Sequence, residues 1–160
     1  MLRITQFALD IIYAHAEETF PDECCGMMSS PATGGNVDVA HRCTNIQNKL
    51  HEKEPEEYPR TAVEAYYIDP LEMMKIQRFI DDENRHLAGI YHSHPNEESY
   101  FSAEDKHKAM WDDEPMMPDA HYIIASVNNG KIAYSKSFTW DVENEDFVEE
   151  QIEVVPDSNQ

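Results

Sequence analysis

The sequence of 160 residues is poor in positive charge and has no long apolar runs, and each shortage excludes a class of protein. It contains 12 Lys and Arg against 32 Asp and Glu, which gives a formal net charge of −20. A chain this acidic repels phosphate backbones and anionic lipid, so its charge speaks against nucleic-acid and membrane-surface partners. No apolar run approaches the roughly 18 residues that a membrane-spanning helix needs.

Cysteine is also scarce, and its placement argues against a disulfide framework. The three cysteines are Cys24, Cys25 and Cys43, and the two adjacent ones are poorly placed to bridge each other. The first residues, 1–4, lack the basic and apolar regions of a secretory signal. We therefore expect a protein of the reducing cytoplasm.

Length and composition predict one folded domain over residues 1–160, with residues 141–160 forming an acidic C-terminal segment. From Ser137 to Gln160 there are eight acidic residues and no Lys or Arg. The simplest interpretation of this run is a solvated surface or a fraying tail. A docking face for a basic partner and an adaptation to salt are the alternatives.

Hydrophobic periodicity predicts an α+β fold in which helices sandwich a mixed sheet. The expected helices are 5–20, a second that begins after Asp69, and 102–111; the expected strands are 25–29, 37–43, 65–68, 86–91, 121–127 and 131–139. The order of these elements does not fit a doubly wound Rossmann fold. Residues 44–60 are polar and contain two prolines, which predicts a long loop that is functional or mobile.

Two short sequences give sharper local predictions. Asp69 is expected to cap the second helix, with Pro70 at its first position and Glu72 completing a capping box. Asn129-Gly130 predicts a type I′ hairpin turn, because that turn needs positive φ at both central residues.

The segment from His92 to Asp105 carries the residues of a metal site. His92 and His94 are two apart on a predicted strand, so their imidazoles face the same side. Asp105 follows in the first turn of a new helix, where its carboxylate can return to the same point. Two imidazoles and one carboxylate leave a tetrahedral position open, which is typical of catalytic zinc sites. Taken alone, Ser102 to Asp105 is better explained as a helix N-terminus, and only the combination with the two histidines favours a metal site.

These residues resemble the signature of the JAMM (MPN+) metalloproteases. The stretch 92–95, His-Ser-His-Pro, followed by Ser102 and Asp105, matches the pattern HxHPxxxxxxSxxD of that family. The stretch 21–26, Pro-Asp-Glu-Cys-Cys-Gly, is similar to an element of its prokaryotic, Mec-like members and places the family's essential glutamate at Glu23. The resemblance runs from about residue 5 to about 150, and it implies a JAMM/MPN, cytidine-deaminase-like architecture.

The resemblance also implies a mechanism and a substrate class. One Zn²⁺ per chain would be held by His92, His94 and Asp105, with Glu23 moving protons and Ser102 donating to the oxyanion. The implied reaction is hydrolysis of a peptide or isopeptide bond after the C-terminal Gly-Gly of a ubiquitin-like or sulfur-carrier protein, including removal of amino-acid adducts. It further places the 44–60 segment beside the cleft, where it orders over a bound glycine tail, whereas a surface insertion without a role is the alternative.

Three other interpretations of the same residues remain open. In the first, the chain is a binding module that holds ubiquitin-like tails without turnover. In the second, it is a structural zinc domain. In the third, Cys24 or Cys25 acts as a thiol nucleophile. The oligomeric state is not set by the sequence.

Overall fold

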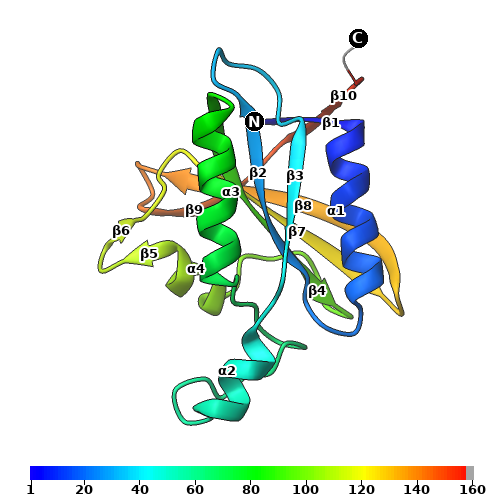
Figure 1. Cartoon of the computed structure of the whole chain (residues 1–160), viewed down its shortest axis with the longest axis vertical. Helices are drawn as coiled ribbons and strands as arrows, with labels where there is room; N and C mark the ends of the chain where they lie inside the picture. Colours follow the sequence, from blue (N-terminus) through cyan, green and yellow to red (C-terminus); the bar gives the residue numbers. More distant parts are fainter. Residues whose placement is uncertain (158–160) are drawn as a thin grey trace.

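The computed structural model describes residues 1–157, which are built around a six-stranded mixed sheet of order β3-β2-β4-β7-β8-β9 (Figure 1). In chain order the elements are β1 (Leu2–Thr5), α1 (Gln6–Thr19), β2 (Cys25–Pro31), β3 (Val39–Cys43), α2 (Gln47–Lys53), α3 (Pro70–Asp82), β4 (Arg85–Pro95), α4 (Ala103–Ala109), β5 (Met110–Trp111), β6 (Glu114–Pro115), β7 (His121–Asn128), β8 (Lys131–Asp141), β9 (Asp146–Glu150) and β10 (Ile152–Val155). Within the sheet β4 and β7 run parallel and the other neighbours antiparallel. The predicted α+β fold is confirmed.

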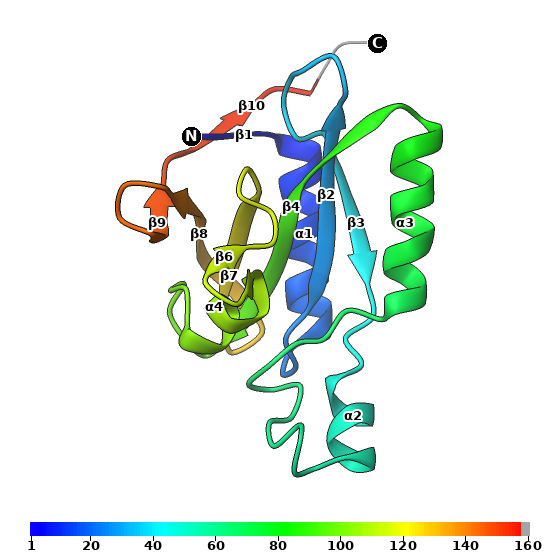
Figure 2. The same cartoon turned by 90° about the vertical axis from the view of Figure 1, so that its left-hand side faces the viewer.

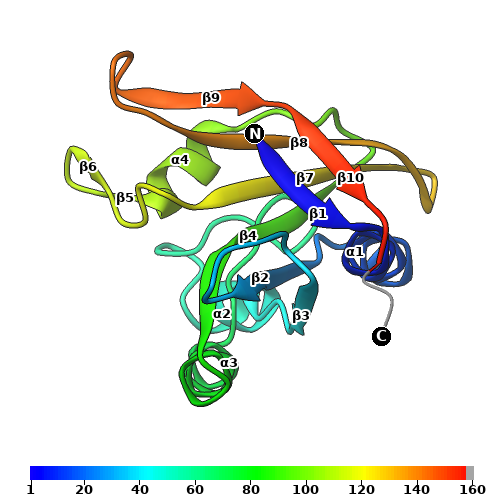
Figure 3. The ribbon, with the colours of Figure 1, turned by 90° about the horizontal axis from the view of Figure 1, so that it is seen from above.

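Helices cover both faces of this sheet, as Figure 3 shows from above. Helix α1 packs on one face, against a core that includes Met28 and Tyr91. Helix α3 packs on the other face with Met27 and Ile90, and α4 lies on that same face. Because successive side chains of a strand alternate between faces, His92 and His94 of β4 share the face of Ile90. The strand alternation therefore aims both imidazoles at the layer that contains α4.

The predicted local signals at the start of α3 and in the hairpin are largely confirmed. The side chain of Asp69 accepts a hydrogen bond from the backbone N–H of Leu71, and Pro70 is the first residue of α3. Asn129 and Gly130 have φ angles of 50° and 83°, which a type I′ turn requires. The predicted capping box is wrong, because the Glu72 carboxylate instead accepts hydrogen bonds from the N–H and hydroxyl of Thr44.

The segment between β3 and α3 differs from the prediction of a loop followed by a strand. Residues 44–60 contain the helix α2, which lies beyond the lower end of the sheet in Figure 2. Residues 65–68 form no strand, since Ile68 makes only an isolated bridge to Asn45. The side chains of Asn45 and Gln47 point inward and donate to the backbone carbonyls of Glu23, Ala65 and Arg60. Polar residues therefore form an ordered segment here, because they supply its internal hydrogen bonds.

The acidic C-terminal segment is also more ordered than a fraying tail, although its last residues, 158–160, lie outside the described part. Strand β9 extends the main sheet, and β10 pairs parallel with β1. Glu150 is bonded to the amino group of Met1 and to Ser137, and Glu153 pairs with Arg3. No helix in residues 1–157 is long and apolar enough to cross a membrane.

The close packing of Tyr91 on Gly26 predicts that a side chain at residue 26 destabilises the fold. These residues are register partners on β2 and β4, and the Tyr91 ring lies across the glycine. A Cβ added at Gly26 would lie 2.2 Å from Cε1 of that ring, so the G26A variant must displace it. We expect G26A to lower the free energy of unfolding by about 3 kcal/mol, the upper end of overpacking costs, as measured by urea denaturation.

A double-mutant cycle isolates this contact. We expect Y91L to cost less stability in the G26A background than in the wild type, because both changes disturb the same packing. Identical urea midpoints for G26A and the wild type would contradict the assignment.

Candidate metal centre

The end of β4 and the start of α4 bring together the predicted metal ligands. His92 and His94 lie near the C-terminal end of β4, which Pro95 terminates. Helix α4 begins after Ser102, so Asp105 stands in its first turn. A capping box fixes this turn: the Ser102 hydroxyl oxygen accepts from the Asp105 N–H, and the Asp105 carboxylate accepts from the Ser102 N–H. The same bonds that start the helix thus orient the Asp105 carboxylate.

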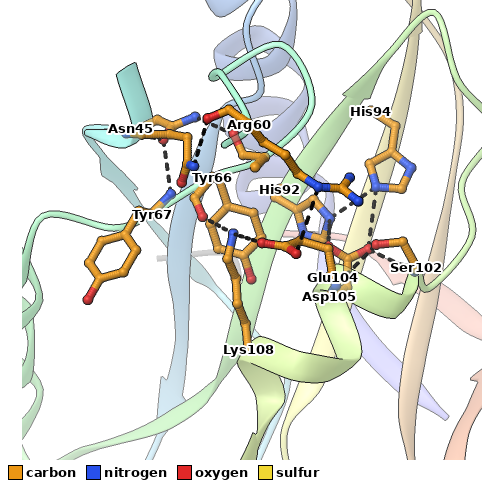
Figure 4. Close-up of polar contacts among 12 residues, drawn as sticks. Asn45, Arg60, Tyr66, Tyr67, His92, His94, Ser102, Glu104, Asp105 and Lys108 are labelled. Carbon is orange, nitrogen blue, oxygen red and sulfur yellow. Dashed lines mark hydrogen bonds and ion pairs between the residues drawn. The ribbon is translucent and has the colours of Figure 1, made fainter. Parts of the chain in front are cut away.

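Figure 4 shows the three side chains converging. The two Nε2 atoms of His92 and His94 are 3.3 Å apart. Asp105 Oδ1 lies 3.1 Å from His92 Nε2, and Asp105 Oδ2 lies 3.4 Å from His94 Nε2. All three side chains are buried.

This geometry fits a tetrahedral ion such as zinc. Zinc–nitrogen bonds of 2.0–2.1 Å imply an edge of about 3.3 Å between donors of a tetrahedron. The three measured separations, 3.1, 3.3 and 3.4 Å, lie around that value. His94 Nδ1 donates to the carbonyl oxygen of Glu98 at 2.8 Å, and this bond fixes the ring so that Nε2 faces the centre. The donor set therefore suits a zinc ion, and two imidazoles with one carboxylate leave a fourth position open.

The electrostatics of the cluster keep Asp105 ionised. Burial opposes its charge, but the neighbouring His92 and the hydrogen bonds from both imidazoles and the Ser102 backbone hold the pKa of Asp105 well below its usual range. Burial lowers the pKa of His92, so this imidazole is neutral at pH 7, as a metal ligand must be. An anionic carboxylate beside a neutral imidazole is the protonation state that a cation requires.

The ring of His92 is held by stacking. Tyr66 lies against it with ring centroids 4.5 Å apart and an interplanar angle of 29°. The ammonium of Lys108, on α4, lies 4.2 Å from the centroid of the Tyr66 ring and also donates to the Tyr66 carbonyl. His92 Nδ1 has no hydrogen-bond partner within residues 1–157, so the stacking with Tyr66 orients the His92 ring. The sequence alone did not mark Tyr66, because residue 66 was expected in a regular strand.

Glu23 lies just before β2, and its side chain lines a cavity beside the metal cluster. Its backbone N–H donates to the Ala62 carbonyl at 2.7 Å, and its carbonyl accepts from Asn45 at 2.9 Å. Its side chain is only 4% exposed and lines a cavity of about 590 Å³ with His94, Ser102 and Asp105. Burial, and then the charge of Asp105, raise the pKa of Glu23 well above its ordinary value. A carboxyl group with a raised pKa at a cavity is suited to receiving and returning a proton.

Ser102 combines a capping role with a place at the cavity wall. Its hydroxyl oxygen accepts the Asp105 N–H at 3.1 Å, so its own hydrogen stays available to donate. The sequence allowed either a helix cap or a site residue at this position, and the geometry is compatible with both at once.

The cysteines do not supply a nucleophile. Cys24, Cys25 and Cys43 are free and buried. Burial raises the pKa of Cys24 and of Cys43 to about 12, and that of Cys25 further still. Since the thiolate is the reactive form, these are inert core thiols at neutral pH.

Comparison with known proteins shows the family and agrees with the fold. Residues 5–141 match the family model of prokaryotic homologues of the JAB domain. A desampylase of Haloferax volcanii is 29% identical over 137 residues, which cover 83% of this chain and 86% of that protein. A CysO-cysteine peptidase of Mycobacterium bovis is 29% identical over 121 residues, which cover 76% of this chain and 70% of that protein.

Solved structures agree in fold. A protein of Desulfitobacterium hafniense superimposes with a TM-score of 0.73 at 24% identity, covering 98% of this chain and 94% of that one. A JAB1/MPN domain protein of Archaeoglobus fulgidus gives a TM-score of 0.55 at 16% identity, with 97% of each chain covered. With a family match over residues 5–141, this chain belongs to the prokaryotic homologues of the JAB domain.

Proposed function

We propose that this chain is a zinc-dependent peptidase. Its substrate is a peptide or isopeptide bond that follows the C-terminal Gly-Gly of a ubiquitin-like or sulfur-carrier protein. The observation that carries the proposal is the buried cluster of His92, His94 and Asp105, which adjoins one cavity with Glu23 and Ser102. The names of the relatives, desampylase and CysO-cysteine peptidase, support the substrate class.

The proposed chemistry divides between the ion and the side chains. When bound, zinc would polarise a carbonyl and lower the pKa of water from 15.7 to about 7. The Glu23 carboxylate accepts the proton of the attacking water and returns it to the nitrogen of the leaving amine. The Ser102 hydroxyl donates a hydrogen bond to the oxygen of the scissile carbonyl as that oxygen gains charge. His94 and Asp105 keep fixed positions through Glu98 and through the start of α4.

The cavity beside the metal cluster has room for an extended glycine tail. The cavity has a volume of about 590 Å³ and is enclosed by the residues before α3 on one side and the start of α4 on the other. Two glycines can pass between such walls in an extended conformation, with backbone groups available for pairing. The free buried thiols support a reducing, cytoplasmic setting.

The metal assignment predicts a defined loss of zinc. We expect about one zinc ion per purified chain, and loss of that ion in a variant that combines H94A with D105A, because one remaining imidazole cannot chelate. Elemental analysis after gel filtration measures this. The matched control is H107A, which removes an exposed imidazole from α4, the helix that also carries Asp105. This variant should keep its zinc. Full zinc occupancy in the double variant would sink the assignment.

The state of the zinc-free protein separates a catalytic site from a structural zinc domain. A catalytic site predicts that chelation abolishes hydrolysis while circular dichroism and the thermal unfolding transition remain largely native. Global unfolding on chelation would instead favour the structural role.

The role of Glu23 predicts a split between binding and chemistry. We expect E23Q to keep zinc and to bind a Gly-Gly tail, but to lose about 10²- to 10⁴-fold in kcat, because the amide cannot accept a proton. E64Q is the matched control, since Glu64 is an exposed carboxylate on the same cavity. Loss of zinc in E23Q would make Glu23 a ligand, and near-normal turnover would require another base. A zinc-loaded wild type that binds the tail without any turnover would be a binding module.

A further inference from the structure

Among the Asp, Glu, Lys and Arg side chains that line the cavity beside the metal cluster, all but one are acidic. Glu23, Glu64, Glu97 and Asp105 line it, and Arg60 is the one Lys or Arg on the lining within residues 1–157. Figure 4 shows the Arg60 side chain reaching from its segment toward the cluster.

The backbone around Arg60 is anchored by the side chains of α2. Gln47 Nε2 donates to the Arg60 carbonyl at 3.0 Å, and Gln47 itself is only 3% exposed. His51 Nδ1 donates to the Tyr58 carbonyl at 2.8 Å, ahead of Arg60. Successive turns of one helix thus hold the segment that presents Arg60, which lowers the entropy cost of placing its side chain at a substrate.

The Arg60 guanidinium makes one long ion pair and has N–H donors to spare. Arg60 Nε is 3.9 Å from Glu104 Oε2, which is an ion pair but longer than a hydrogen bond. Glu104 is shared with Lys108, whose Nζ lies 3.8 Å from the other carboxylate oxygen. The Arg60 side chain is 51% exposed, and it has five N–H donors in a planar fork. Its donors therefore remain available to a ligand that enters the cavity.

A carboxylate is the ligand that this fork matches best, because two parallel N–H···O bonds form at once. When the residue after Gly-Gly is the last of its chain, its α-carboxylate lies only two bonds from the nitrogen of the scissile bond. A lysine side chain in an isopeptide has no carboxylate at that distance. The carboxylates of Glu64 and Glu97 repel such an anion from the other walls, so Arg60 also fixes its direction.

We propose that Arg60 is a specificity-determining residue that binds the free α-carboxylate of the leaving residue. This inference rests on the proposed peptidase function and narrows its substrate to carriers that bear a single C-terminal amino acid after Gly-Gly. Lysine-linked conjugates are poorer substrates, because they leave the Arg60 fork without a partner.

Matched peptides test this directly. Peptides of one sequence ending in Gly-Gly-Ala are prepared as the free acid and as the C-terminal amide, and a third carries Gly-Gly on a lysine side chain. We expect the zinc-loaded wild type to hydrolyse the acid with a kcat/KM about ten- to a hundredfold above that of the amide and of the isopeptide. The R60Q variant should lose most of this acid-to-amide ratio, and R60K should retain part of it, because ammonium keeps the charge without the fork.

The control variant is K49Q, which removes an exposed positive charge from α2 without touching the cavity, and its acid-to-amide ratio should equal that of the wild type. Zinc content and circular dichroism establish that R60Q remains folded and loaded. An acid-to-amide ratio that is the same in R60Q and the wild type overturns the role of Arg60, while the measured hydrolysis leaves the proposed function standing. If the zinc-loaded wild type hydrolyses none of the three peptides, the proposed function fails and this inference fails with it.

Discussion

The buried carboxylate of Asp105 is the constraint on which the site depends. A charge that is only 5% exposed is tolerated when it is paired and hydrogen-bonded, and here the partners are His92, His94 and the Ser102 backbone. These groups meet because the chain turns after β4 and because α4 then lies over the face of β4 that carries the two imidazoles. The position of β4 between β2 and β7 then shields the cluster from both sides along the sheet. The sheet order, the strand end at Pro95 and the helix cap are thus parts of one arrangement.

The parts of this arrangement that could be predicted from the sequence are those determined by interactions between residues close together in the chain. Two imidazoles on one face of a strand follow from the alternation of side chains, and the capping of α3 by Asp69 follows from its own neighbours. The hairpin at Asn129-Gly130 is equally local. The α+β class was predictable because it needed only the order of such elements. In each case the deciding interaction spans only a few residues.

The features that the sequence did not predict depend on partners far along the chain. Strand β10 lies in the acidic C-terminal segment, and its order depends on pairing with β1, more than a hundred residues away in the sequence. The sequence of helix α2 resembles a polar loop, and its order depends on the hydrogen bond from Gln47 to the Arg60 carbonyl. The stacking of Tyr66 on His92 has no pattern of its own, since it requires a chain path from α2 to α3 that follows no regular period. Propensity and periodicity do not contain these contacts, because tertiary partners supply the hydrogen bonds that the local sequence leaves open.

One segment, residues 44–69, joins the support of the proposed base to that of the proposed specificity residue. Asn45 bonds to the carbonyl groups of Glu23 and Ala65, and Ala62 accepts the Glu23 N–H. Fifteen residues after Asn45 the same segment presents Arg60 to the same cavity. A substrate carboxylate at Arg60 and a proton on Glu23 would therefore be held by one hydrogen-bonded unit. In such a unit, a leaving group bound at Arg60 would be placed within a restricted range of the Glu23 carboxyl, because the backbones of Arg60 and Glu23 share one support.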